Sequence, residues 1–326
     1  MNFPFSTQTG WLIAMVFATV LMMLFLSSCG CCGRGSSHVQ AAPCRCCFEE
    51  RALQGVRRTY PVNIHAGKGR VVLLLHEANG QSPGTLWLAK ELGDAGCKVY
   101  VPRFFGGYGS NHGLIYTLKL LGNPDWNLFS ATDSGAIRGE VKALTEAIAK
   151  ENPGRKITVI GNCMTGSLPL ELLQNESVDT AIVCQPALPF FSRTNERKTS
   201  YGLPREVVDR SLKILADNPH KRLIHFNYLG DTVGIIERSQ YLAGRTHPGK
   251  AAARHELYIG VGPATGGYYG SPGAKALPAG AQPLYTEKVK NTLISRAHST
   301  ITGATGKDLE IYRQRLFEVL GLKRAG

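Results

Sequence analysis

Short apolar runs alternate with amphipathic segments from about residue 48 to the end of the chain. After its first residue, Arg70–Leu75 is continuously apolar, as is typical of a strand buried on both faces of a parallel sheet. Similar runs predict further strands at 97–101, 157–160, 180–184, 222–228 and 256–260, and an early edge strand at 56–64. The run at 256–260 is expected to be the last strand.

Helices are expected between these strands. Residues 135–152 place apolar side chains on one helical face, and further helices are predicted at 85–96, 205–216, 235–243 and 307–320. This alternation predicts a three-layer α/β domain with a mostly parallel sheet. The Gly-, Pro- and Ala-rich stretch from Gly262 to Pro283 shows no strand or helix pattern, so we treat about 262–292 as an insertion.

The N-terminus carries an apolar run of 16 residues, Trp11–Leu26, broken only by Thr19. Leu26-Ser27-Ser28-Cys29 resembles a bacterial lipoprotein box, in which Cys29 is lipidated and residues 1–28 are removed. Residues 1–10 contain no Lys or Arg, however, whereas signal peptides usually begin with a basic region. The alternative is an uncleaved transmembrane segment, with the arginines that follow it favouring a cytoplasmic domain. Both predict membrane attachment through residues 1–28, and the side of the membrane stays open.

Six of the nine cysteines lie between Cys29 and Cys47, in two Cys-x-Cys-Cys groups. Zinc binding, acylation and disulfide formation are each compatible with this cluster, and so is a flexible tether with incidental thiols. We interpret 29–47 as a Cys-rich tether and 48–326 as the folded domain, and we assign no metal ligand.

Composition narrows the function classes. The chain has 43% hydrophobic and 19% charged residues, which is typical of a globular protein. The net charge of +13 comes from scattered lysines and arginines rather than from a basic stripe, so nucleic-acid binding is not expected. Attraction to an anionic membrane surface or an anionic substrate fits the charge better.

The stretch from Lys156 to Leu170 combines a buried strand, a turn and a helix start. Gly161 and Cys163 follow the β-branched run, and Pro169 occupies a position suited to the first turn of a helix. This layout predicts a nucleophile elbow, in which the sulfur of Cys163 projects above the sheet and helix amides favour a thiolate. The alternative is that Cys163 is simply a buried cysteine at a strand end.

Three motifs together resemble the dienelactone hydrolase branch of the α/β-hydrolases. Gly161-Asn-Cys163-Met-Thr-Gly166 is similar to that branch's Gly-x-Cys-x-Gly-Gly elbow, and His76-Glu77 follows an early buried strand as in the family. Asp231 follows a later strand, where the family carries an acid. The resemblance covers roughly residues 70–320 and implies an α/β-hydrolase fold that cleaves an ester, lactone or thioester without a cofactor.

An α/β-hydrolase places its triad in the order nucleophile, acid, histidine. Cys163 and Asp231 obey this order, although Asp231 alone is also compatible with an ordinary turn. His247 and His255 lie before or at the start of the expected last strand. His298 follows that strand and precedes the last helix, and no other histidine occurs after His255, so we predict that His298 is the base.

The resemblance implies further roles. Glu77 corresponds to a glutamate that contacts the nucleophile and controls its protonation, because a carboxylate beside a thiol disfavours the thiolate. The amides of Ala78 and Met164 are expected to form the oxyanion hole, whereas His76 is expected to support the loop.

The chain departs from the family in two respects. Thr165 replaces a glycine of the elbow. The family's substrate-binding arginines have no certain counterpart, although Arg103 and Arg296 lie near the appropriate loops.

We therefore predict a membrane-attached hydrolase with a Cys163–His298–Asp231 triad that acts on a small-molecule ester, lactone or thioester. One alternative is a catalytically silent hydrolase fold that serves as a membrane-tethered binding or scaffold protein. A second makes the Cys-rich tether the working part, as a metal or redox site. Substrate identity and oligomeric state stay open.

Overall fold

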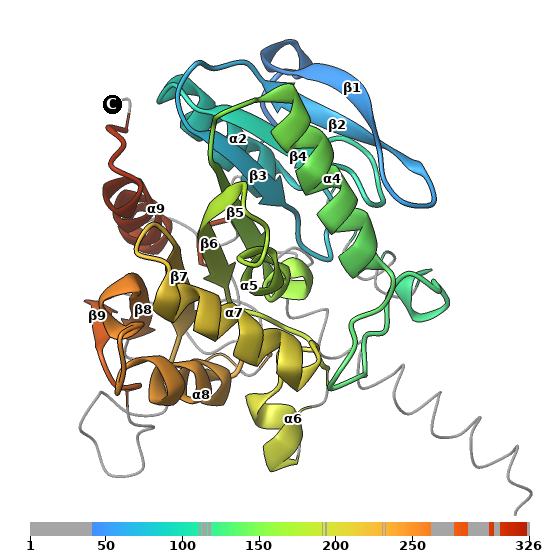
Figure 1. Ribbon diagram of the computed structural model, residues 1–326. Helices are drawn as coiled ribbons and strands as arrows, with labels where there is room; N and C mark the ends of the chain where they lie inside the picture. Colours follow the sequence, from blue (N-terminus) through green and yellow to red (C-terminus); the bar gives the residue numbers. More distant parts are fainter. Residues whose placement is uncertain are drawn as a thin grey trace, which may run out of the picture.

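The computed structural model describes residues 41–110, 112, 116, 119–190, 192, 194–229, 231, 233–261, 277–285, 300–302 and 307–324. This part of the chain forms a single mixed sheet in the order β1-β2-β4-β3-β5-β6-β7-β8-β9 (Figure 1). β2 pairs antiparallel with β1 and β4, and the other neighbours pair in parallel. The strands are β1 (Glu49–Gln54), β2 (Thr59–His65), β3 (Val71–Leu75), β4 (Lys98–Pro102), β5 (Ile157–Asn162), β6 (Val178–Cys184), β7 (Arg222–Tyr228), β8 (His255–Val261) and β9 (Ala281–Tyr285).

Helices cover both faces of this sheet. One apolar cluster joins β3–β7 to α2 (Pro83–Asp94) and α9 (Lys307–Val319), and Figure 1 shows α9 on the opposite side of the sheet from α4 (Ile137–Glu151) and α7 (Arg205–Asp217). On that second face, α4 packs on β3 and β5, while α5 (Leu168–Leu172), α7 and α8 (Ile236–Thr246) pack on β6–β8. The short α6 (Asn195–Thr199) precedes α7. The predicted three-layer α/β architecture is therefore confirmed.

The central strands match their predicted positions closely, because β3, β5 and β6 are apolar on both faces and almost completely buried. Two expectations about the edges were wrong. The strand expected at 56–64 is the second half of a hairpin, with β1 before it and a turn at 55–58. The stretch expected to lack structure contains β9, which pairs in parallel with β8. In β9 only Leu284 is buried, so the sequence carries no strand pattern there.

The turn of the β1–β2 hairpin is held against α4 by a buried carboxylate. Glu140 accepts hydrogen bonds from the backbone N–H groups of Val56 (2.9 Å) and Arg57 (3.1 Å). Arg57 also pairs with Glu140 and with Asp125, and Arg58 pairs with Asp125. These contacts satisfy two carboxylates that would be costly to bury alone, and they fix the edge hairpin to the body of the sheet.

The end of the predicted tether lies on the domain. Trp87 Nε1 donates to the carbonyl of Ala41 (2.7 Å), and the Tyr108 hydroxyl donates to the carbonyl of Pro43 (2.7 Å). Cys44, Cys46 and Cys47 are free thiols in and beside the 3-10 turn η1 (Arg45–Cys47). The chain is thus already packed on the domain before β1 begins.

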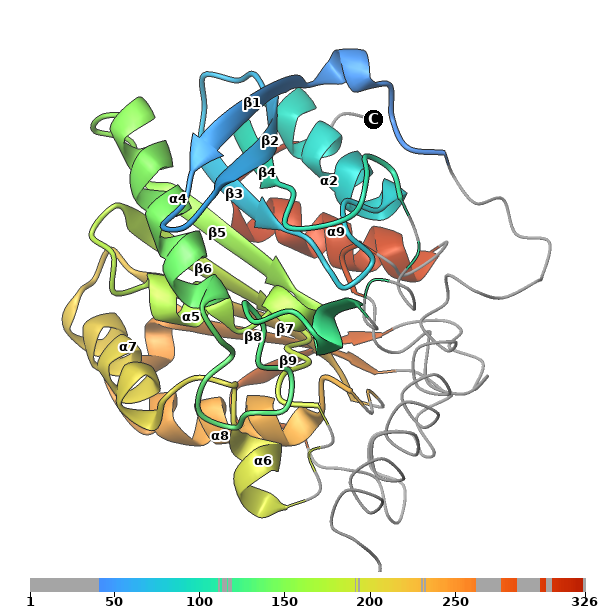
Figure 2. The same cartoon turned by 90° about the vertical axis from the view of Figure 1, so that its right-hand side faces the viewer.

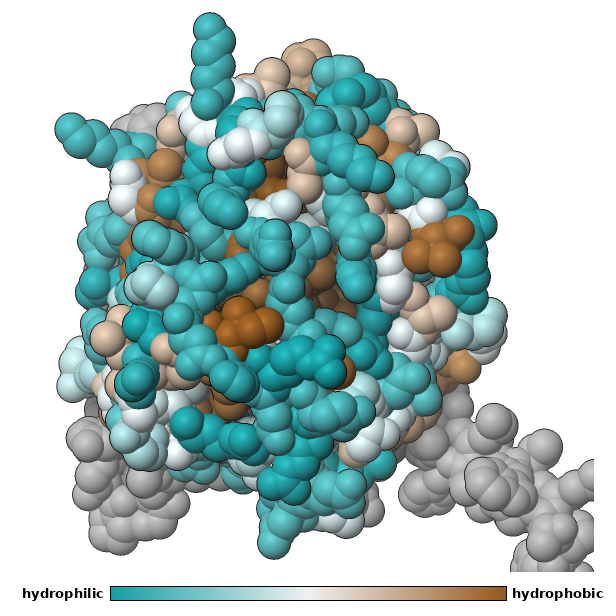
Figure 3. All heavy atoms as spheres, in the orientation of Figure 1, coloured by the Kyte–Doolittle hydropathy of each residue, from teal (hydrophilic) through white to brown (hydrophobic). Residues whose placement is uncertain are grey.

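The predicted membrane segment and Cys29 lie outside the described residues. Within those residues, no helix has both the length and the apolar character needed to cross a bilayer. The surface over α4 and α7 is mostly hydrophilic with scattered apolar side chains (Figure 3). That face therefore presents no broad apolar area.

Candidate active site

Cys163 lies at the carboxyl end of β5, in the strained turn that the sequence predicts. Its φ is +54°, a left-handed value that is uncommon for a residue with a side chain, and it begins the 3-10 turn η2 (Cys163–Thr165). Pro169 is in the first turn of α5, as expected. Cys163 is 5% exposed. Strand, left-handed cysteine and helix together form an elbow, and strain of this kind is concentrated at functional sites.

Close backbone approach explains the small residues of the elbow. A Cβ added at Gly161 would lie 2.3 Å from the carbonyl oxygen of Thr165, and one added at Gly166 would lie 2.6 Å from that of Cys184. The second small position therefore falls three residues after Cys163 rather than two. Thr165 does not disrupt the elbow, because the second position that must be small is Gly166.

Thr165 is completely buried and connects the elbow to the end of β3. Its hydroxyl oxygen accepts from the N–H of Asn162 at 3.0 Å. The carbonyls of Asn162 (3.0 Å), His76 (3.2 Å) and Leu75 (3.4 Å) surround the same hydroxyl as acceptors. The elbow and the loop after β3 are therefore held together by the residue that departs from the family pattern.

The loop after β3 contains Glu77 and Ala78, both buried. His76 braces this loop, because the Phe104 N–H donates to His76 Nε2 (3.1 Å) and His76 Nδ1 therefore donates to the Glu77 carbonyl (2.8 Å). Burial lowers the pKa of His76 to about 4, so the ring is neutral. A neutral ring with both nitrogens engaged supports the loop, as the sequence predicts.

Asp231 lies three residues beyond the end of β7 and is 2% exposed. Its Oδ1 accepts from the backbone N–H groups of Val233 (2.8 Å) and Gly234 (2.9 Å). These bonds fix the carboxylate on the loop. In Figure 2, β3 and β5 point in the same direction, and β7 is parallel to them. Cys163, Glu77 and Asp231 follow the carboxyl ends of these strands, so they lie at the same end of the sheet.

His298 lies outside the described residues, but Thr300–Thr302 are described and buried. The Thr300 N–H donates to Gln185 Oε1 at 3.2 Å, and its hydroxyl donates to the same oxygen. The Thr302 hydroxyl donates to Glu77 Oε1. The chain that follows His298 is thus attached to residues at the ends of β6 and β3.

The arginines considered for substrate binding do not gain support. Arg103 is paired with Glu50 of β1 at 3.6 Å, and Arg296 lies outside the described residues. Of the described arginines, Arg138 pairs with Glu171 and Asp133, and Arg197 donates to the carbonyl of Phe190. Partly buried Phe104, Phe105, Phe190 and Val233 instead pack against the apolar cluster that includes Cys163. The described packing around Cys163 is therefore with apolar side chains, and the arginines named here are engaged by other groups.

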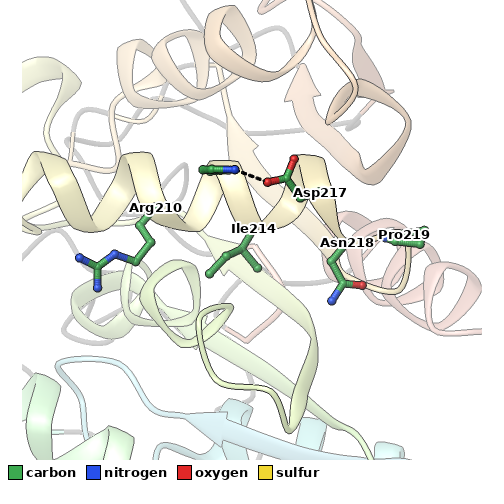
Figure 4. A pocket seen from close by; sticks show the side chains of 6 residues that line it. Arg210, Ile214, Asp217, Asn218 and Pro219 are labelled. Carbon is green, nitrogen blue, oxygen red and sulfur yellow. Dashed lines mark hydrogen bonds and ion pairs between the residues drawn. The ribbon is translucent and has the colours of Figure 1, made fainter.

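A shallow cavity of about 330 Å³ lies elsewhere, beside the end of α7 (Figure 4). Arg210, Lys213, Ile214 and the turn at 217–219 line it, and Lys213 pairs with Asp217. This turn leads into the amino end of β7, at the edge of the sheet opposite to Cys163. Within the described chain, no group of three or more His, Cys, Asp or Glu side chains is arranged to hold a metal ion.

Three residues of this region had no signal in the sequence. Gln185, with φ +31° and no exposed surface, holds Thr300, and Thr302 holds Glu77. The third, Arg238, is completely buried and donates to the carbonyl of Val233 on the loop of Asp231. The roles of these residues depend on partners more than 35 residues away in the sequence, or on an unusual backbone conformation. Local sequence patterns reveal neither.

The mostly parallel sheet, with a strand–turn–helix elbow after its central strand β5, gives this chain the α/β-hydrolase fold. No protein-family model matches the chain, and a search of curated proteins finds no match either. Three solved structures with similar arrangements share only 12–13% identity with it.

One, from Klebsiella pneumoniae, is assigned as a dienelactone hydrolase (13% identity, covering 83% of this chain and 96% of that one, TM-score 0.49). Another is an esterase from Pyrococcus furiosus (13% identity, 84% and 91%, TM-score 0.49). A third is a dienelactone hydrolase-like promiscuous phosphotriesterase from metagenomic libraries (12% identity, 85% and 100%, TM-score 0.49). At these values the fold assignment rests on the sheet and the elbow, not on the alignments.

Proposed function

We propose that this protein is a hydrolase of the dienelactone hydrolase type, with Cys163 as its nucleophile. The observation that carries the proposal is the φ of +54° at Cys163, in an elbow at the carboxyl end of β5. A cysteine that only filled the core would gain nothing from this strained conformation, which costs about 1–3 kcal/mol. The buried carboxylates Glu77 and Asp231 at the same edge supply the remaining polar groups that the resemblance implies.

In the proposed reaction, Cys163 Sγ attacks the carbonyl carbon of an ester, lactone or thioester while its proton passes to His298. The N–H groups of Ala78 and Met164 stabilise the oxyanion. The C–O or C–S bond of the leaving group then breaks, and His298 returns the proton to that group. Water, deprotonated by His298, attacks the acyl-enzyme and releases the carboxylic acid and the free thiol. Asp231 orients His298 throughout.

The position of Thr300 supports His298 as the base. Thr300 is held by Gln185 at the end of β6, the strand that neighbours β5. Two residues of chain span at most about 7 Å, so the position of Thr300 is compatible with the proposed role of His298. Glu77, whose Oε1 accepts from Thr302, would oppose the thiolate in the resting enzyme and yield to substrate.

Apolar side chains near the elbow favour a neutral substrate. The described arginines named above are engaged by carboxylates or carbonyls, and Glu77 and Asp231 would repel an anion placed beside Cys163. We therefore infer that the substrate is an uncharged ester, lactone or thioester rather than one that carries a carboxylate next to the scissile bond.

Turnover of neutral and carboxylate-bearing p-nitrophenyl esters tests this proposal. Cys163→Ala should abolish hydrolysis, whereas Cys184→Ala, a matched change one strand away, should retain most of it. Wild-type protein should prefer the neutral ester. Equal hydrolysis by wild type and Cys163→Ala would overturn Cys163 as the nucleophile, and no hydrolysis by either would favour the scaffold alternative.

Membrane attachment through residues 1–28 is a separate proposal that rests on the apolar run alone. Intact-mass measurement of membrane-extracted protein distinguishes its two forms. A chain that begins at a lipidated Cys29 supports the lipoprotein, and a chain that retains Met1 supports the transmembrane anchor. An unmodified full-length chain recovered in the soluble fraction would exclude both.

A further inference from the structure

Arg238, in the first turn of α8, is completely buried, and all five of its N–H donors have acceptors. Nε donates to the carbonyl of Ser200 (2.8 Å). One terminal nitrogen donates to the carbonyls of Pro186 and Val233, the latter at 3.0 Å. The other donates to the carbonyl of Pro189 (2.8 Å) and the hydroxyl of Ser192 (2.7 Å). Every one of these acceptors is a neutral oxygen. Arg238 therefore holds backbone segments together rather than forming half of an ion pair.

The acceptors belong to segments that hold the candidate nucleophile and acid. The segment after β6 includes Pro186 and Pro189, and between them the Ala187 N–H donates to the carbonyl of Cys163 (2.9 Å). The acid loop includes Val233, whose N–H donates to Asp231 Oδ1. One guanidinium therefore joins the segment that contacts Cys163 to the loop that carries Asp231.

We propose that Arg238 is a positioning residue that fixes the separation of Cys163 and Asp231. It does so by hydrogen bonding to the loops after β6 and β7 at the same time. This inference rests on the proposed function. Arg238 does not touch the reacting atoms. It acts through Ala187 on one side and Val233 on the other, and the rigid fork of a guanidinium suits this because its donors diverge at fixed angles.

The charge of Arg238 contributes separately from its geometry. Asp231, Glu237, Arg197 and Tyr201 are the ionisable groups that influence it, and burial lowers the pKa of Arg238 to about 10, so it is charged at neutral pH. A buried positive charge opposes the binding of protons by groups around it. Removing the charge should therefore move the acidic limb of activity to higher pH.

Two substitutions separate these effects. Arg238→Lys keeps the charge but supplies three donors on a flexible stem, so kcat should fall about 10-fold or more with little change in KM and no shift of the pH profile. Arg238→Met should lower kcat further and shift the acidic limb upward. Steady-state kinetics on a neutral ester across pH measures both.

Arg254→Met is the matched control. Arg254 also donates to backbone carbonyls, those of Leu215 and Ala216, but at the end of α7, on the opposite edge of the sheet. It should lower Tm and leave kcat and the pH profile unchanged. If Arg238→Met does not fold, Ser192→Ala decides, because it removes one acceptor and should still reduce kcat about 2- to 5-fold at constant KM.

The outcomes are distinct. An active wild type with unchanged kcat in folded Arg238→Lys and in Ser192→Ala would overturn this inference and leave the proposed function intact. If the wild type shows no turnover, or turnover that Cys163→Ala does not reduce, the proposed function is overturned, and this inference with it.

Discussion

Two cysteines occupy the ends of neighbouring strands in this fold, and they differ in almost everything except residue type. Asn162, which precedes Cys163, is the register partner of Cys184, so the two cysteines belong to adjacent strands about 4.8 Å apart. Cys163 leaves β5 with φ +54°, whereas Cys184 ends β6 inside a regular ladder. Cys184 packs in the cluster with α2 and α9, and Cys163 in the cluster on the other face.

Both residues are cysteines at the ends of adjacent central strands, so neither residue type nor location distinguishes them. Their backbone conformations do, and only that of Cys163 suits a candidate nucleophile. Burial raises the pKa of Cys184 well above its ordinary value, and the charge of Glu77 raises it further. Cys184 is completely buried at the end of its strand, so we expect its thiol to be unreactive. The elbow is what gives Cys163 another environment.

Thiol reactivity should show the largest difference. In the folded protein, iodoacetamide should modify Cys163 more than about 100-fold faster than Cys184, because the proposed base His298 can take the proton of Cys163, whereas burial raises the pKa of Cys184 within its strand. Peptide-resolved mass spectrometry is the appropriate measurement, since exposed Cys44 and Cys46 will also react.

Cys97 provides an internal reference, because it is buried outside the elbow and burial likewise raises its pKa. Cys163 labelling at the slow rate of Cys97 in the native state, with fast labelling of all three in urea, would contradict the assignment of an activated thiol.

Acid should weaken the fold independently of any effect on Cys163. Burial lowers the pKa of His76 to about 4 and of His255 to about 3, and lowers that of His225 well below its usual value. The unfolded chain binds protons to these rings near pH 6.5, so stability is full above that pH and falls as pH decreases. Each ring contributes up to about 1.4 kcal/mol per pH unit, or about 4 kcal/mol per unit for the three.

Urea unfolding from pH 7 to pH 4.5 measures this slope. His225→Gln should reduce it by about a third, whereas His220→Gln, at an exposed position, should leave it unchanged. If stability did not vary over this range, the neutral state of the buried rings would be wrong.

The difference in the free energy of unfolding between a glycine and an alanine variant should be the smallest effect, and it should have opposite signs at Cys163 and Cys184. At Cys163 glycine relieves the left-handed backbone, so Cys163→Gly should be about 1 kcal/mol more stable than Cys163→Ala. At Cys184, within a strand, Cys184→Gly should be about 0.5–1 kcal/mol less stable than Cys184→Ala.

Denaturant midpoints of the four variants give the comparison directly. The same sign at both positions would mean that Cys163 is not strained in solution, and the elbow would lose its main physical support.

The sequence was sufficient for the central sheet and for the strand, turn and helix around Cys163. Strands buried on both faces leave continuous apolar runs, as in Val71–Leu75, and Gly161 and Pro169 mark the turn between strand and helix. Edges were harder, because β9 buries only one side chain and β1 alternates too weakly to be distinguished from a loop.

The supporting polar residues could not be predicted for a different reason. Gln185, Arg238 and Thr302 gain their roles from partners distant in sequence, and nothing local distinguishes them from ordinary surface residues. Thr165 shows the converse. It interrupts a family pattern, yet its hydroxyl ties the elbow to the loop after β3.

The hydrogen bond from Thr302 to Glu77 joins residues 225 positions apart, close to the two ends of the folded domain. A ribosome that adds about 5–20 residues each second needs roughly 11 to 45 s to make the chain between them. Cys163 is therefore synthesised long before its edge of the sheet can be completed, and a nascent or prematurely terminated chain should carry an ordinary thiol. The protein acquires its proposed chemistry only after synthesis has passed Thr302.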